Sequence, residues 1–145
     1  MDYDILYYDT SVVIPSDVKA KMLDAVCDIY DKDTAHTFER ELDEQVPYKY
    51  VVITDRNRTK VIGLGCLMNS GLDFDIWEFA WGLVRKEYQG MGYGKILNNE
   101  RIKIVKEKLG KEILAVTTKV WHLKHSGFRI VHVFPNGDNL MVCDV

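Results

Sequence analysis

The junction formed by residues 84–97 (VRKEYQGMGYGKIL) constrains the fold more than any other feature of this sequence. Apolar β-forming residues lead into it, alternating Gly90, Gly92 and Gly94 occupy its middle, and apolar residues at helical spacing follow. The pattern predicts a strand, a glycine-rich loop and the first turn of a helix, where N–H groups lack partners and the helix dipole adds positive charge. Because glycines let a backbone approach a phosphate closely, the junction predicts an anion site with Lys95 at its rim.

The spacing of these glycines excludes two common phosphate-binding loops. A Walker A loop needs glycine where Gln89 stands and Ser or Thr where Ile96 stands. The dinucleotide fingerprint GxGxxG fits Gly90 and Gly92, but its third glycine falls on Lys95. The strands before the loop also form a meander rather than a parallel unit. We therefore expect neither an NTPase nor a dinucleotide-binding enzyme.

Hydrophobic periodicity places the junction within an α+β chain. Three consecutive strands with short turns precede it and predict an antiparallel meander, and a strand–helix–strand crossover spans it. Length predicts one domain, residues 1–145. The expected strands are 3–9, 48–54, 60–68, 74–85, 112–117, 128–134 and 139–144. The expected helices are 17–30, 34–44, 95–109 and 118–125, and Gly110 is expected as the C′ glycine that caps the third of these helices.

Composition narrows the classes of function. A net charge of −3 argues against broad nucleic-acid binding, because phosphate neutralisation dominates that affinity. Cys27, Cys66 and Cys143 are far apart and form no CxxC motif or metal-ligand spacing, which predicts buried free thiols and no metal site. No signal peptide or apolar run of about 18 residues is present, so we expect a cytoplasmic protein that does not bind membranes.

A second reading of the junction gives the spacing Gln89-x-x-Gly92-x-Gly94, preceded by Val84-x-x-x-Tyr88. With these residues the chain resembles the GNAT superfamily of acyl-CoA-dependent N-acyltransferases, and the order of predicted elements matches that family over nearly the whole chain. The resemblance implies a mixed, mostly antiparallel central sheet of six or seven strands with about four helices on its faces.

The resemblance also implies that acetyl-CoA is the co-substrate. Leu83 and Val84 would pair through their backbone with the pantetheine arm, as an added strand does. Gly82 suggests a bulge or a close backbone approach, and the family bulges this strand. The pyrophosphate would bind to backbone N–H groups of Gln89, Gly90, Met91, Gly92, Tyr93, Gly94 and Lys95.

Glu78 is the candidate general base, because many family members carry an acid six residues before the position of Val84. It would accept a proton from the attacking amine, directly or through water. Its carboxylate is expected among the large apolar side chains of this strand, which predicts a raised pKa for Glu78. The expected faces are Glu78, Ala80 and Gly82 on one side and Trp77, Phe79 and Trp81 on the other.

The C-terminal segment departs from the family pattern. Gly127-Phe128 is kept, but Leu123 stands where relatives often carry a Tyr that protonates the leaving thiolate, and Lys119 replaces an Ala. His122, His125 and Ser126 are candidate substitutes. Alternatively no acid is needed, or the catalytic half has drifted.

Charge distribution points to the acceptor. Residues 1–50 hold 12 acidic and 5 basic side chains, and Asp73 and Asp75 precede the Glu78 strand. This balance favours a cationic amine, either a small molecule or a protein amine. We expect an N-acetyltransferase; a catalytically degenerate coenzyme A-binding or protein-interaction member is the alternative, and a nucleotide-binding regulator is the least favoured. Whether the chain forms a homodimer stays open.

Overall fold

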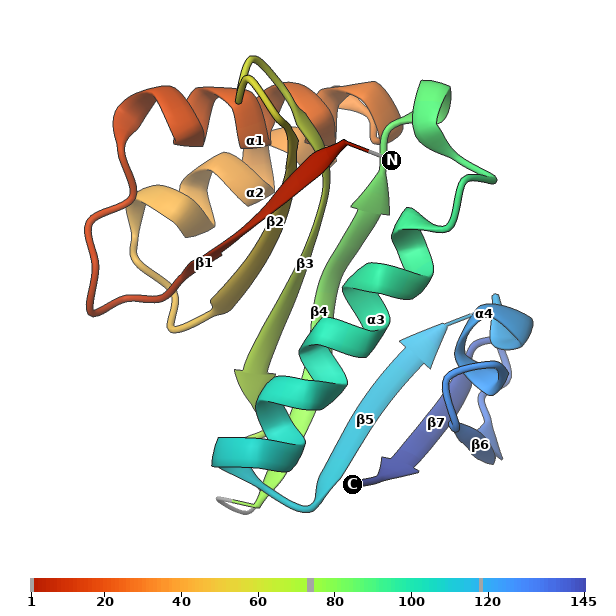
Figure 1. Ribbon diagram of the computed structural model, residues 1–145. Helices are drawn as coiled ribbons and strands as arrows, with labels where there is room; N and C mark the ends of the chain where they lie inside the picture. Colours follow the sequence, from red (N-terminus) through yellow and green to blue (C-terminus); the bar gives the residue numbers. More distant parts are fainter. Residues whose placement is uncertain (1, 73–74, 118) are drawn as a thin grey trace.

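The computed structural model describes residues 2–72, 75–117 and 119–145, so the expectation for Asp73 lies outside the described residues. A seven-stranded sheet runs through the molecule in the order β1-β2-β3-β4-β5-β7-β6 (Figure 1). Its strands are β1 (Tyr3–Tyr8), β2 (Lys49–Asp55), β3 (Val61–Asn69), β4 (Ile76–Val84), β5 (Glu112–Thr117), β6 (Arg129–Val133) and β7 (Asn139–Asp144). The helices are α1 (Ser16–Ile29), α2 (Lys32–Asp43), α3 (Tyr93–Ile104) and α4 (Val120–Lys124), with a 3-10 turn at Lys86–Tyr88 and a π-helical turn at Val105–Leu109.

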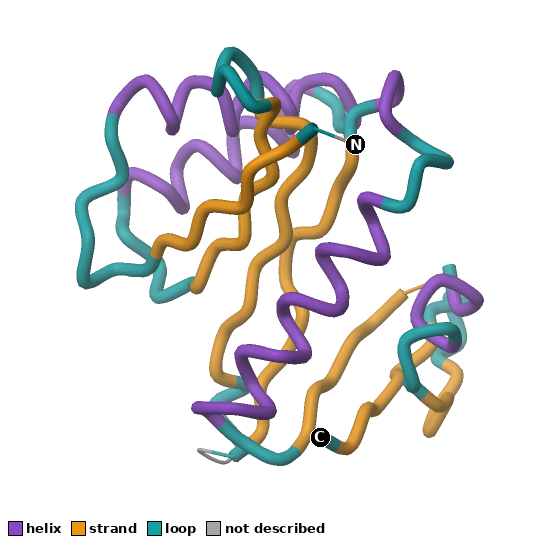
Figure 2. The backbone as a smooth tube through the Cα atoms, viewed as in Figure 1, coloured by secondary structure: helices purple, strands orange, loops and turns teal. Residues whose placement is uncertain are grey.

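The predicted α+β fold is confirmed. Every neighbouring pair of strands is antiparallel except β4 and β5, which are parallel because α3 forms the crossover between them. Figure 2 shows α1 and α2 on one face of the sheet and α3 on the other. Both faces of β3 are therefore covered, and its residues from Val61 to Leu67 are all buried. None of the described helices is long and apolar enough to cross a membrane.

Strands β4 and β5 pair over only three residues each. The parallel ladder joins Ile76–Glu78 to 112–114, and β5 then continues along β7. Beyond Glu78 the two strands diverge, as Figure 1 shows. The edge of β4 from Phe79 to Val84 consequently has no ladder partner on its β5 side among the described strands.

The predicted alternation along β4 is wrong after Phe79, because the strand contains a bulge. Gly82 pairs with Gly65 and Phe79 with Leu67, so β4 has one more residue than β3 in this interval. The bulge reverses the faces: Trp77 and Phe79 pack on the α3 side, whereas Trp81 packs on the α1/α2 side. Conversely Gly82 faces α3 rather than sharing a face with Glu78 and Ala80.

Two other local expectations are also corrected. Gly110 does not adopt a left-handed helix cap; its backbone is extended, with φ −178°. A Cβ there would lie 2.4 Å from the Asp75 carbonyl oxygen, so close backbone approach explains the glycine. Cys66 and Cys143 are buried, but Cys27 is exposed on α1.

The tyrosines at the start of β2 predict how stability depends on pH. Tyr48 and Tyr50 are 7% and 4% exposed, and burial raises the pKa of both phenols. Since their folded pKa lies above the unfolded value of about 10, stability is present below pH 10 and falls as pH rises beyond it. We expect each buried phenol to remove about 1 kcal/mol from the free energy of unfolding at pH 11, measured by urea denaturation.

Tyr50→Phe provides the control. No hydrogen bond of the Tyr50 hydroxyl is found within the described chain, so the variant removes only the titrating group. The wild type should lose more stability than Tyr50→Phe between pH 9 and pH 11. Equal losses would contradict the assignment.

Candidate functional site

The glycine-rich loop connects the end of β4 to α3 and presents an open backbone surface. Gly90 and Gly92 have φ +79° and +93°, the left-handed region that side chains disfavour. A Cβ placed on Gly90, Gly92 or Gly94 would meet no heavy atom within 4 Å. The protein therefore leaves free space directly above all three glycines.

The donors of this surface are backbone N–H groups. The N–H of Gln89 donates to the Lys86 carbonyl oxygen (3.3 Å), but the next six, from Gly90 to Lys95, have no acceptor within the described parts of the chain. The helix that starts here is 12 residues long, so its dipole adds partial positive charge at the same place. Lys95 is exposed beside these groups. The arrangement is suited to binding a phosphate or pyrophosphate.

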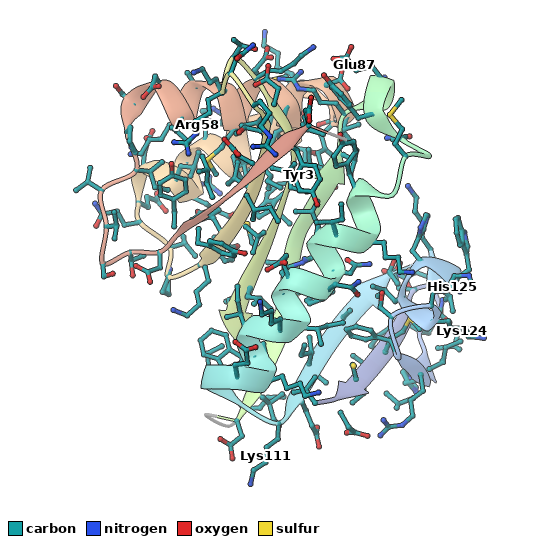
Figure 3. All side chains as sticks on the ribbon, in the orientation of Figure 1. Tyr3, Arg58, Glu87, Lys111, Lys124 and His125 are labelled. Atoms are coloured by element: carbon teal, nitrogen blue, oxygen red, sulfur yellow. The ribbon has the colours of Figure 1, made fainter. Side chains whose placement is uncertain are left out.

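Side chains of the loop fix its position against neighbouring elements and do not cover the row of backbone N–H groups. Tyr93 is 5% exposed, and its ring makes edge contacts with Tyr3 (5.7 Å between centroids) and Tyr88 (5.8 Å). Figure 3 shows Tyr3 pointing from β1 toward this end of α3. The Gln89 amide donates to the Val84 carbonyl oxygen (3.0 Å), which ties the loop to the strand end. Met91 is half exposed.

A clamp from α1 fixes the start of the loop. Arg85 is 7% exposed; its guanidinium donates to the Val61 carbonyl oxygen and to Asp24. Asp28, one turn later on α1, accepts from the Lys86 N–H (2.8 Å). Sequence reasoning missed this clamp. The i, i+4 spacing of Asp24 and Asp28 is a visible signal, but only the tertiary structure shows that this face of α1 meets the loop.

The strand that leads to the loop carries the other predicted residues. Leu83 is buried in the α1/α2 core, and Val84 packs toward α3, so their side chains fix the strand while their backbone borders the divergence of β4 and β5. Glu78 is paired with Leu114, the last pair before the strands diverge. Val84 lies six residues after Glu78 along the strand, which corresponds to about 20 Å.

Glu78 is half buried and lies on the α1/α2 side of the sheet with its β3 neighbour Met68. Its carboxylate makes no hydrogen bond or ion pair within the described chain. A carboxylate without a fixed partner at the apex of two diverging strands is free to accept a proton from a group bound between them.

The C-terminal residues considered as proton donors to the leaving thiolate do not lie beside Glu78. Leu123 is 8% exposed and packs in the core with Phe128, so an apolar side chain fills the position where relatives often carry Tyr. His122 stacks on Trp121 (3.6 Å), and its pKa is lowered by burial, then by Lys119 and His125. Figure 3 shows His125 at the surface of the C-terminal part.

Among the described residues no hydrogen bond or ring contact joins His122, His125 or Ser126 to Glu78. The Ser126 hydroxyl is buried and has no hydrogen-bond partner in the described structure. The described residues also contain no group of three or more His, Cys, Asp or Glu side chains that could hold a metal ion.

A sequence profile of the Acetyltransferase (GNAT) family matches residues 20–128, which include the α1 clamp, the bulged strand and the loop. The chain belongs to this family. No curated protein matches the chain in sequence.

Solved structures agree with this family at the level of the fold. A GNAT-family protein from Desulfovibrio desulfuricans, assigned as an acetyltransferase, is 18% identical with a TM-score of 0.80, and the match covers 98% of each chain. A GNAT family acetyltransferase from Elizabethkingia anophelis with acetyl-CoA bound is 17% identical with a TM-score of 0.67, over 99% of each chain. The PaiA N-acetyltransferase from Thermoplasma acidophilum in complex with coenzyme A is 14% identical with a TM-score of 0.67, over all of both chains.

The backbone of the GNAT loop generates a stability prediction. Gly92 precedes α3 with φ +93°, so Gly92→Ala would place a Cβ in the left-handed region. We expect a loss of roughly 1–2 kcal/mol in the free energy of unfolding, measured by urea denaturation. Gly94→Ala, in the first turn of α3, is the matched control and should not lose stability. Equal stability of the two variants would contradict the expected strain at Gly92.

Proposed function

We propose that this GNAT protein is an acetyl-CoA-dependent N-acetyltransferase that moves an acetyl group from coenzyme A to a primary amine. The observation that carries the proposal is the row of unpartnered N–H groups from Gly90 to Lys95, which follows the end of β4 at the open side of its divergence from β5. The bound acetyl-CoA and coenzyme A in the two structural neighbours support the same ligand for this chain.

Coenzyme A would bind along two backbone surfaces. Its pyrophosphate would accept from the loop N–H groups at the start of α3. Its pantetheine arm would lie beside the open edge of β4 and pair with the backbone of Leu83 and Val84. The thioester would then lie toward Glu78, at the narrow end of the divergence.

The reaction would be a direct attack within a ternary complex. The amine nitrogen attacks the thioester carbonyl carbon, a C–N bond forms and the C–S bond breaks. The proton released by the amine passes to Glu78, directly or through water. A backbone N–H of the bulged part of β4, between Glu78 and Leu83, would stabilise the negatively charged oxygen. The departing thiolate has a pKa near 8.5, so its need for a dedicated acid is modest.

Acidic side chains favour a cationic acceptor. Residues 1–50 carry 12 acids against 5 bases, and α1 and α2 come from this part of the chain. Most of their acids are exposed, Asp17, Asp33, Glu39 and Asp43 among them. Their field would raise the local concentration of an amine, whether a small molecule or a protein amine.

The overall reaction is tested by incubating the protein with acetyl-CoA and a panel of amines while free thiol is measured. Amine-dependent thiol release, with mass spectrometry of the acetylated product, is the expected result. Binding of acetyl-CoA without amine-dependent release would instead favour the degenerate member of the family. Leu123 in the core, at the usual Tyr position, is the observation that supports that alternative.

Gly94→Ala tests the location of the pyrophosphate. A Cβ at this position meets no protein atom within 4 Å, so only a ligand can clash with it. We expect the dissociation constant for coenzyme A, measured by calorimetry, to rise at least about tenfold while the free energy of unfolding does not fall. Wild-type affinity in this variant would exclude the loop as the pyrophosphate site.

Glu78→Gln tests the general base. The amide keeps the size of the side chain but cannot accept the proton, so kcat should fall about 100-fold with coenzyme A affinity unchanged. Glu107→Gln, an exposed acid on the turn that follows α3, is the matched control. A wild-type rate for Glu78→Gln at every pH would remove Glu78 from the mechanism.

A further inference from the structure

Arg101 on α3 is a buried cation without a carboxylate partner. It is 4% exposed, and no Asp or Glu forms an ion pair with it in the described chain. Its guanidinium donates to neutral acceptors: the Asn98 side-chain oxygen (2.8 Å) and the carbonyl oxygens of Cys66 (3.3 Å), Trp81 (3.3 Å) and Leu97 (3.4 Å). Burial lowers the pKa of Arg101 to about 10. Taking a charge out of water is costly, so its retention here calls for a reason.

The sheet is shaped to receive this guanidinium. Gly65 and Gly82 face each other across β3 and β4, and a Cβ on Gly65 would lie 2.8 Å from Arg101 Nε. A Cβ on Gly82 would lie 3.4 Å from Nη2. The Phe79 ring lies 3.7 Å from the guanidinium carbon and adds a cation–π contact. Two glycines and an aromatic ring thus form a slot for one cation.

This slot is located at the bulge of β4. Cys66 and Trp81 lie where the β3–β4 register shifts, between the pairs Gly65–Gly82 and Leu67–Phe79. Their carbonyl oxygens both accept from Arg101 Nη1. The cation therefore links the two strands where their own ladder is interrupted.

The opposite face of the bulge is held by an anion. The Trp81 indole N–H donates to Glu41 on α2 (2.7 Å), and the same carboxylate accepts from the Tyr48 hydroxyl (3.1 Å). Trp81 is therefore fixed from both sides of the sheet. Arg101 on α3 donates to its carbonyl oxygen, and Glu41 on α2 accepts from its side chain. Bulges that re-aim a strand are common next to active sites.

We propose that Arg101 is a positioning residue for acyl transfer: it holds the β4 bulge so that the backbone beyond it faces the divergence of β4 and β5. This inference rests on the proposed function, because the backbone from Trp81 to Val84 would border the thioester and the pantetheine arm. A fixed N–H direction there lowers the reorganisation needed when negative charge develops on the thioester oxygen.

A structural role alone makes a different prediction. Replacing a buried charge by an apolar side chain of similar volume is often neutral or stabilising. If Arg101 serves only stability, its removal should lower the melting temperature and leave the kinetics of the folded fraction unchanged. If Arg101 positions the bulge, kcat should fall although the protein stays folded.

The experiment compares Arg101→Met and Arg101→Lys with the wild type. Lys103→Met, which removes an exposed cation from the same helix, is the matched control. Steady-state kinetics with an amine from the panel give kcat and KM, and calorimetry gives the dissociation constant for coenzyme A. Hydrogen–deuterium exchange with coenzyme A bound follows residues 79–84, with residues 49–55 of β2 as the internal reference.

For Arg101→Met we expect kcat to fall at least about tenfold, the dissociation constant to change less than about threefold, and exchange at 79–84 to accelerate while 49–55 does not change. Arg101→Lys keeps the charge but lacks the planar guanidinium, which binds Asn98 through Nη2 while Nη1 donates to both carbonyl oxygens, so its kcat should also fall. Lys103→Met should match the wild type.

Unchanged kcat and unchanged exchange at 79–84 in the Arg101 variants would overturn the inference, as would a loss of stability with normal kcat. If Arg101→Met does not fold, the Lys variant decides by the same three measurements. A wild type that binds coenzyme A but releases no thiol with any amine overturns the proposed function instead, and exchange at 79–84 then decides whether Arg101 holds the bulge.

Discussion

The parallel pairing of β4 with β5 ends after three residues, and the proposed site depends on that interruption. The crossover through α3 makes the two strands parallel, and β5 then continues along β7 instead of β4. The divergence opens one edge of β4, while the side chain of Leu83 stays buried in the core. The loop follows one end of β4 and Glu78 lies near its other end, so the same strand positions both parts of the proposed site.

Most of the fold could be predicted from the sequence because its signals are local. Helical spacing located α1 and α2, and the run of β-formers from Val61 located a strand that is buried on both faces. The glycine spacing after Val84 located the loop and, through its resemblance, the family. Each of these patterns lies within about 15 residues of chain, where periodicity and turn chemistry are informative.

The missed features depend on contacts between distant segments. The bulge that Gly82 suggested is present, but the predicted faces of β4 did not allow for it: one extra residue reverses the alternation and moves Trp81 to the other face. The clamp of Arg85 by α1 and the slot for Arg101 join segments far apart in sequence. The i, i+4 spacing of Asp24 and Asp28 and the strand glycines Gly65 and Gly82 were visible in the sequence, but neither pattern identifies the distant segment that it meets.

The exposed thiol of Cys27 offers a natural position for attaching a fluorescent label. Cys66 and Cys143 are buried, and burial raises the pKa of both thiols, so a thiol-directed dye should react first at Cys27. Cys27 immediately precedes Asp28, which accepts from the Lys86 N–H at the entrance of the loop. An environment-sensitive fluorophore attached to Cys27 would report changes in the loop, and no residue would have to be substituted to attach it. Ligand binding could then be followed without first knowing the acceptor.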